Sequence, residues 1–170
     1  DMGPSIADTQ WRTVMGYIEA GRQEGARLLT GGHRPDHLSQ GWFIQPTIFD
    51  DVQPGMRIFQ EEIFGPVLSV ATATSLEDAL AKANGVEYGL TTSIFTRDIN
   101  TVMRFVEDVE VGMVHVNEPT VGGEAQLPFG GTKSTGVGER EMAEEGLNFF
   151  TDIKTVFVNY GGAAGPSLTR

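Results

Sequence analysis

Apolar residues recur at helical spacing over the first thirty positions of the chain. Trp11, Val14 and Ile18 would all lie on one side of such a helix. Gly31 and the glycine that follows it end the pattern, as glycine commonly does at the end of a helix. We therefore predict a helix within residues 6–29 whose last part passes into a short strand at 27–30.

From residue 42 onward, runs of β-branched and aromatic residues alternate with segments of helical period. Pro46 lacks the backbone N–H that a sheet ladder needs, so the first of these runs is expected at a sheet edge or a bulge. Ser75 starts a sequence that resembles a capping box, and Asp98 is a suitable N-cap for the next helix. The predicted strands are 42–49, 65–73, 91–96, 112–117 and 153–160, and the predicted helices are 75–83, one that begins after Asp98, and 141–150.

Strands and helices follow one another in turn between residues 65 and 117. Such an order implies right-handed crossovers and a parallel sheet that is covered on its faces. The sequence therefore predicts an α/β fold with an open, mainly parallel sheet and helices on both faces. A length of 170 residues fits one domain.

A glycine-rich stretch without a clear period, residues 118–138, directly follows the predicted strand 112–117. Connections this long in a compact domain are usually either functional or disordered. Ligands of open α/β sheets bind beyond the carboxyl ends of the strands, where this stretch begins. We therefore expect a ligand pocket here. Phe129, in glycine-rich surroundings, either walls that pocket or packs into the core.

The composition excludes several classes of function. A net charge of −11 repels phosphate backbones and anionic lipid headgroups, so neither nucleic acid nor a membrane surface is an expected partner. The chain has no cysteine and supplies no thiolate nucleophile, and no serine or threonine has an adjacent base pattern to replace one. We expect no catalytic residue in this chain. The absence of disulfides agrees with a cytoplasmic location, which we also expect.

Two pairs of titratable residues are candidates for chemistry. His33 and His37 are four residues apart, but Pro35 lies between them in a turn-rich segment, so a solvated loop is the better interpretation and no metal site is expected. Glu61 and Glu62 stand beside an aromatic residue and a Gly-Pro break. These two acids form either a ligand edge or a solvated helix end.

Several segments, taken in order and at their spacings, carry a resemblance to a known family. The main ones are Gly41-Trp42-Phe43, Glu61-Glu62-Ile63-Phe64-Gly65-Pro66, Tyr88-Gly89-Leu90, Pro128-Phe129-Gly130-Gly131 and Lys154-Thr155-Val156. With them the chain resembles the C-terminal part of the aldehyde dehydrogenase superfamily over nearly its whole length. Residues 1–152 are similar to most of the catalytic domain and 153–160 to a terminal oligomerisation strand, with 161–170 as a disordered tail.

The resemblance implies a reaction, a cofactor and site residues. The parent enzyme would oxidise an aldehyde to a carboxylic acid with NAD or NADP, and loop 118–127 resembles branches that oxidise semialdehydes. The nucleophilic cysteine, the general base and the dinucleotide-binding domain would lie outside this chain, which should be inactive alone. By resemblance, the cofactor-binding residues are Glu62 at the nicotinamide ribose, Phe64 beside the nicotinamide ring, Gln10 and Leu90, and the substrate-binding residues are Phe129, Val121 and Glu124.

The resemblance also implies a homo-oligomer, a dimer or tetramer, held through strand 153–160. An unpaired strand edge is exposed to aggregation unless another subunit or domain covers it. Two other hypotheses remain open. Under the first, the chain is a non-catalytic assembly or binding module of the same fold. Under the second, it is a cofactor-free structural remnant whose exposed former interface makes it self-associate.

Overall fold

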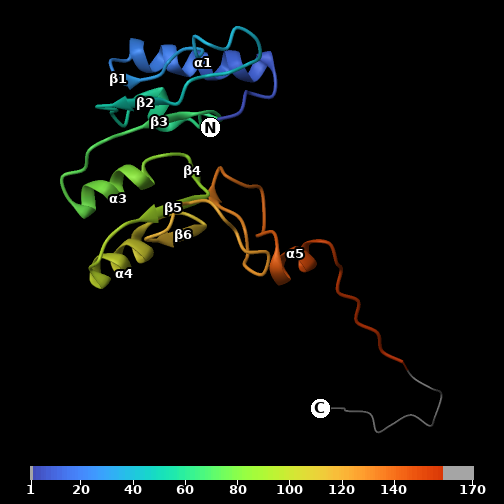
Figure 1. The fold of residues 1–170 in the computed structure, drawn as a ribbon. Coiled ribbons are helices and arrows are strands. Elements are labelled where there is room, and N and C mark those ends of the chain that lie inside the picture. Colours follow the sequence, from blue (N-terminus) through green and yellow to red (C-terminus); the bar gives the residue numbers. More distant parts are fainter. Residues whose placement is uncertain (1, 159–170) are drawn as a thin grey trace, which may run out of the picture.

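The computed structural model describes residues 2–158 of the chain (Figure 1). In its first part, a long helix packs with a three-stranded sheet. The first strand pairs antiparallel with the second, and the second pairs parallel with the third. The elements of this part are helices α1 (Asp8–Gln23) and α2 (Arg57–Gln60) and strands β1 (Arg27–Thr30), β2 (Thr47–Asp50) and β3 (Val67–Ser69).

The core of this part lies between α1, α2 and β2. Val14 and Ile18 of α1 and Phe49 of β2 are each 0% exposed. Gly21 allows α2 to approach α1, since a Cβ atom there would lie 2.9 Å from Ile58 Cδ1. Burying one such apolar side chain contributes about 1.5–3 kcal/mol to folding. The one-sided apolar pattern of the sequence thus becomes the buried face of α1, and the predicted helix and the strand 27–30 are confirmed.

The second part of the chain is built around a parallel pair of strands. Strands β5 and β6 pair in register from Thr91 opposite Met113, and α4 forms the crossover between them. Leu80 of α3, Phe105 of α4 and Val109 form the buried cluster that joins the helices to the strands. The elements of this part are α3 (Leu76–Asn84), β4 (Tyr88–Gly89), β5 (Thr91–Ile94), α4 (Ile99–Asp108) and β6 (Met113–Val116).

Both predicted helix caps are present. The Ser75 hydroxyl oxygen accepts a hydrogen bond from the backbone N–H of Asp78 at 3.2 Å. The Asp98 carboxylate accepts the backbone N–H groups of Asn100 at 3.2 Å and Thr101 at 3.1 Å. Each cap satisfies donors that the first turn of a helix leaves without a partner.

The chain after β6 forms a long loop, strand β7 (Thr132–Lys133) and helix α5 (Ala143–Phe149). Strand β7 pairs antiparallel with β4, so the loop returns to the start of the second part. Residues 151–158 adopt no helix or strand and run away from the rest of the structure (Figure 1). Ile153 and Phe157 in this segment are 98% and 94% exposed.

The α/β class is confirmed, with three differences in detail. The strands form three small sheets rather than one open sheet, although the pairs β2–β3 and β5–β6 are parallel as expected. Residues 42–46 form no strand, and β2 begins only after Pro46, which has no N–H for a ladder. Residues 153–158 form no strand here, because nothing in the described part pairs with them; residues 159–170 lie outside the described residues.

Candidate functional site

Segment 61–66 follows α2 and lies against one face of helix α1. The Gln10 side-chain amide donates a hydrogen bond to the backbone carbonyl of Phe64 at 2.7 Å. A Cβ atom on Gly65 would lie 2.6 Å from Val14 Cγ2, so only glycine allows the segment to come this close to the helix. Helix α1 therefore fixes the position of the segment that carries the predicted cofactor residues.

Glu61 is bound within the chain. Its carboxylate accepts two hydrogen bonds from Arg57, at 3.0 Å from Nε and 2.9 Å from an Nη atom, and a third from the Tyr17 hydroxyl at 2.8 Å. The bonds from Arg57 and then Tyr17 lower the pKa of Glu61 from its ordinary value of 4.5 to about 2. Of the two adjacent acids, Glu61 therefore already has donors on both carboxylate oxygens, although its side chain is still 43% exposed.

Glu62 differs from its neighbour. Within residues 2–158 its carboxylate makes no hydrogen bond and no ion pair, and its side chain lines a cavity of about 560 Å³. Leu90 lines the same cavity, together with Tyr88, Thr91 and other residues of the second part. A carboxylate has two acceptor oxygens and suits a partner with two neighbouring hydroxyls. The ligand-edge interpretation therefore fits Glu62.

Phe64 and Gln10 line a second cavity, of about 540 Å³, with residues 2–6. The Phe64 side chain is 76% exposed, which is unusual for a phenylalanine beside a well-packed helix. Its backbone is nevertheless fixed by Gln10. A ring that is exposed on a fixed backbone can present its face to a flat ligand.

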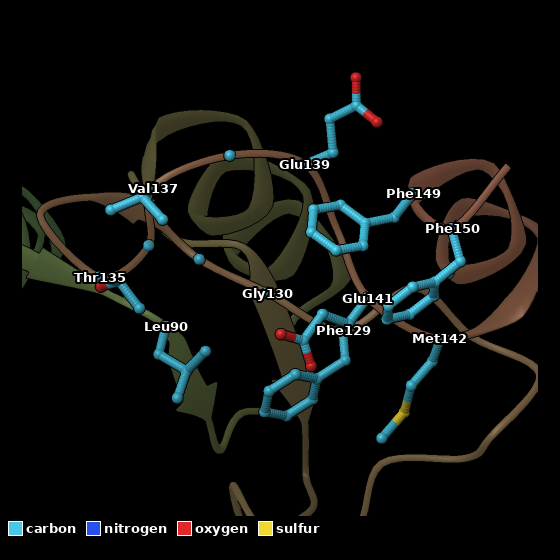
Figure 2. A pocket seen from close by; sticks show the side chains of 14 residues that line it. Leu90, Phe129, Gly130, Thr135, Val137, Glu139, Glu141, Met142, Phe149 and Phe150 are labelled. Atoms are coloured by element: carbon cyan, nitrogen blue, oxygen red, sulfur yellow. The ribbon is translucent and has the colours of Figure 1, made fainter. Parts of the chain in front are cut away.

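Phe129 lines a third, apolar cavity of about 530 Å³, shown in Figure 2. The backbone of Phe129 is held by an antiparallel bridge in which it exchanges two hydrogen bonds with Glu141, both 2.7 Å long. Leu90 lines this cavity and also the cavity that Glu62 lines. Leu90 thus stands between the predicted cofactor side and the predicted substrate side. The other apolar side chains of the wall are Val137, Met142, Phe149 and Phe150.

Val121 and Glu124 do not line the cavity of Phe129. Val121 is 76% exposed, and the Glu124 carboxylate accepts a hydrogen bond from Gln126 at 3.1 Å. Their loop does pass next to Phe129, since a Cβ atom on Gly123 would lie 3.6 Å from the Phe129 ring. The structure therefore places these two residues beside the candidate substrate cavity and not in it.

Tyr17 and Arg57, the two residues that bind Glu61, were not predicted from the sequence. Arg57 and Glu61 are four residues apart, a spacing that favours an ion pair on a helix. Tyr17 lies on the same helical face as Gln10 and Val14, seven and three residues earlier. The spacing could have revealed Arg57, whereas the contact of Tyr17 with Glu61 spans 44 residues and appears only in the folded chain.

His33 and His37 lie in a loop, and Nδ1 of His33 is 3.0 Å from the carbonyl oxygen of Gly31. In the part of the chain that the structure describes, no three histidine, aspartate or glutamate side chains gather as a metal site would require. None of the described helices has the length and apolar character needed to cross a membrane.

The sequence and fold are similar to those of known enzymes. The profile described as "Aldehyde dehydrogenase family" matches residues 1–156. The chain is 45% identical over 159 residues to the alpha-ketoglutaric semialdehyde dehydrogenase of Bacillus subtilis, covering 92% of this chain and 33% of that protein. It is 44% identical over 158 residues to the mitochondrial aldehyde dehydrogenase of Homo sapiens, covering 93% of this chain and 30% of that protein.

Among solved structures, that of the Mycobacterium tuberculosis aldehyde dehydrogenase complexed with NAD+ superimposes with a TM-score of 0.86 at 42% identity, covering 96% of this chain and 33% of that chain. The chain thus spans about a third of the length of these relatives. The family profile, however, covers nearly all of it. On this evidence the chain belongs to the aldehyde dehydrogenase family.

Proposed function

We propose that this chain is the C-terminal part of a longer enzyme that oxidises an aldehyde to a carboxylic acid with NAD or NADP. One observation carries the proposal furthest. The Glu62 carboxylate, without a partner in residues 2–158, lines a cavity whose wall residue Leu90 also borders the apolar cavity of Phe129. A polar anchor beside an apolar pocket is the arrangement expected where a cofactor and an aldehyde meet.

The residues present fit a nicotinamide dinucleotide. Glu62 would accept hydrogen bonds from the two ribose hydroxyls, and Phe64 would lie beside the nicotinamide ring. Gln10 and Leu90 would border the same end of the cofactor. When bound, the nicotinamide accepts a hydride from the substrate. Phe129 and the apolar side chains around it would hold the aldehyde and exclude water from its carbon chain.

The chain alone should be inactive, because it has no cysteine and covers only 33% of the length of its Bacillus subtilis relative. We expect the isolated 170 residues to form no NADH from any aldehyde, whereas the complete enzyme forms it. In the complete enzyme, Glu62→Gln should raise the KM for the dinucleotide by about tenfold or more, since one bond to a charged group contributes about 1.5–3 kcal/mol.

The control is Glu107→Gln, which removes the same charge from an exposed position on α4. Unchanged cofactor kinetics in the Glu62 variant, with the control unchanged as well, would contradict the role given to Glu62. NADH formation by the isolated chain would contradict its dependence on the rest of the enzyme.

For the substrate, we propose a semialdehyde. The relative in Bacillus subtilis is named an alpha-ketoglutaric semialdehyde dehydrogenase, and one in Saccharolobus solfataricus, 46% identical over 158 residues, is named a 2,5-dioxopentanoate dehydrogenase. Loop 118–127 lies beside Phe129, where the substrate chain would enter. Comparing kcat/KM for 2,5-dioxopentanoate and for acetaldehyde tests this assignment, and a preference for acetaldehyde would contradict it.

The second candidate function is assembly. The exposed apolar segment 151–158 favours it, since Ile153 and Phe157 are almost fully exposed, at 98% and 94%. Side chains of this kind are covered in most folded proteins, and here another subunit or the rest of the enzyme would cover them. A homo-oligomer joined through residues 153–160 is compatible with the enzymatic proposal. A cytoplasmic location remains part of the proposal.

A further inference from the structure

Helix α1 presents three residues of one face to segment 61–66, which carries the proposed cofactor residues Glu62 and Phe64. Gln10 holds the Phe64 carbonyl, Val14 packs against Gly65, and Tyr17 holds the Glu61 carboxylate. These three residues are spaced as i, i+4 and i+7, so they form one continuous line along the helix. The segment on either side of Glu62 is therefore fixed to a rigid element.

The contact at Glu61 is the most elaborate of the three. The Arg57 guanidinium donates two bonds to the Glu61 carboxylate and also lies over the Tyr17 ring, 5.0 Å from its centroid. The backbone N–H of Arg57 donates to the Glu24 carboxylate at 2.8 Å, which ties the start of α2 to the end of α1. The planar guanidinium of Arg57 is paired with Glu61 and stacked on the Tyr17 ring, so it has little freedom to rotate.

This cluster separates the roles of two adjacent acids. Both follow Arg57 closely in the chain, and both would attract its positive charge. The Nε and Nη donors of Arg57 both bind the Glu61 carboxylate. The Glu62 carboxylate therefore has no cation as a partner within residues 2–158. A carboxylate paired with arginine would have fewer acceptor positions for a sugar diol.

We propose that Tyr17 and Arg57 are positioning residues for cofactor binding, which act through Glu61 to hold the Glu62 carboxylate free and aimed into its cavity. Neither residue touches the cofactor in this account. The inference rests on the proposed role of Glu62. It goes beyond that role in assigning a function to a cluster that would otherwise only join α1 to α2.

The test measures the dissociation constant of NAD+ by calorimetry and the KM for the aldehyde in the complete enzyme. Arg57→Gln should weaken NAD+ binding about tenfold, the size expected from misplacing one charge-assisted contact, with the aldehyde KM changed less than about twofold. Arg57→Lys keeps the charge but not the fork and should recover only part of the affinity. Tyr17→Phe keeps the ring, loses one hydrogen bond and should weaken binding by about two- to threefold.

Arg104→Gln is the matched control. Arg104 also joins two helices through a carboxylate, that of Glu77, and its side chain is 50% exposed against 53% for Arg57. It lies on α4, away from the residues that line the cavity of Glu62. The control should lose thermal stability comparable to that lost by Arg57→Gln and keep its affinity for NAD+.

The outcomes distinguish the inference from the proposed function. If Glu62→Gln weakens NAD+ binding but Arg57→Gln and Tyr17→Phe only lower the melting temperature, the cluster contributes to stability alone and the inference is wrong. If Glu62→Gln itself binds NAD+ normally, the role proposed for Glu62 is wrong, whatever the other variants do. Weakened binding in the Glu62, Arg57 and Tyr17 variants, with a normal control, supports both.

Discussion

Gly65 lies where segment 61–66 packs closely against helix α1. A Cβ atom there would lie 2.6 Å and 2.9 Å from the two methyl groups of Val14, which is 0% exposed and has no space into which to move. We expect Gly65→Ala to destabilise the chain by about 1–3 kcal/mol, as overpacking does. Urea unfolding measures this effect.

The control for Gly65→Ala is Gly16→Ala. Gly16 lies on α1, and nothing lies within 4 Å of the position that an alanine methyl group would take there. Alanine at this position should therefore stabilise the helix by about 0.5–1 kcal/mol. Equal effects of the two substitutions would contradict the close packing of segment 61–66 on the helix.

Glu61 gives a prediction about pH. Its pKa falls from 4.5 to about 2 on folding, mainly because Arg57 and Tyr17 donate hydrogen bonds to the charged form. A group whose pKa is depressed by folding adds stability above its unfolded pKa, and the added stability is lost as pH falls through the folded value. The free energy of unfolding of the wild-type chain should therefore drop between about pH 4.5 and pH 2.

The comparison variant is Glu61→Gln, which carries no titrating group at this position. Its free energy of unfolding should lie below that of the wild type at neutral pH, and the difference should shrink as the pH falls from 4.5 to 2. A difference that stays constant over this interval would show that Glu61 is not paired in solution.

At the scale of single residues, the sequence suggested candidate ligand contacts but not the side chains that support them. Glu62, Phe64 and Gln10 were proposed from a resemblance. The structure brings Gln10 and Phe64 together in one cavity and places Glu62 in another. Tyr17 carries no local signal of its role. Its partner Glu61 is 44 residues away, and only the packing of α2 on α1 brings the two together.

Helix α3 shows what a single cap contributes at the scale of an element. The Ser75 hydroxyl accepts the Asp78 N–H at 3.2 Å, and only Leu80 of the helix is buried, so packing gives limited support. We expect Ser75→Ala to destabilise the chain by about 0.5–2 kcal/mol and Ser75→Thr to retain most of the stability. Thermal unfolding measures the stability of both variants. An equal loss of stability in the two would contradict the role of the Ser75 hydroxyl as a cap.

Elements with strong periodicity or clear caps were predictable, and short ones were not. The period of apolar residues identified α1, and Ser75 and Asp98 identified the starts of α3 and α4. Strands β4 and β7 have two residues each, too few to show any alternation. Their pairing depends on the return of the loop after β6, which no local pattern encodes.

The predicted strand 153–160 illustrates a different limit. Its alternating sequence is typical of a strand, but a strand also needs a partner for its backbone groups. Residues 153–158 find none in the described chain. The alternating pattern therefore indicates that this segment can form a strand where a partner strand is present. It does not predict the conformation of the segment in the isolated chain.

At the scale of the whole molecule, many large apolar side chains are exposed. Phe64, Phe150 and Phe157 are 76%, 83% and 94% exposed, in a chain that spans about a third of the length of its relatives. Such surfaces are normally covered by other parts of a protein or by other subunits. These exposed side chains support the proposal that the rest of a longer enzyme or another subunit covers them.

The proposed assembly leads to a prediction about quaternary structure. Removing the residues after Gly146 from the complete enzyme deletes the end of α5 and segment 151–158. We expect the shortened enzyme to sediment as a smaller species than the intact dimer or tetramer, because segment 153–160, through which we propose that the subunits join, is gone. An unchanged sedimentation coefficient, corrected for mass, would contradict assembly through this segment.

The most direct test of the account is the crystal structure of the complete enzyme with its dinucleotide bound. Both Glu62 carboxylate oxygens should lie within about 3.2 Å of the hydroxyls of the nicotinamide ribose, with the Glu61 carboxylate still bound by Arg57 and Tyr17. A Glu62 side chain that points into solvent, away from the bound dinucleotide, would contradict it.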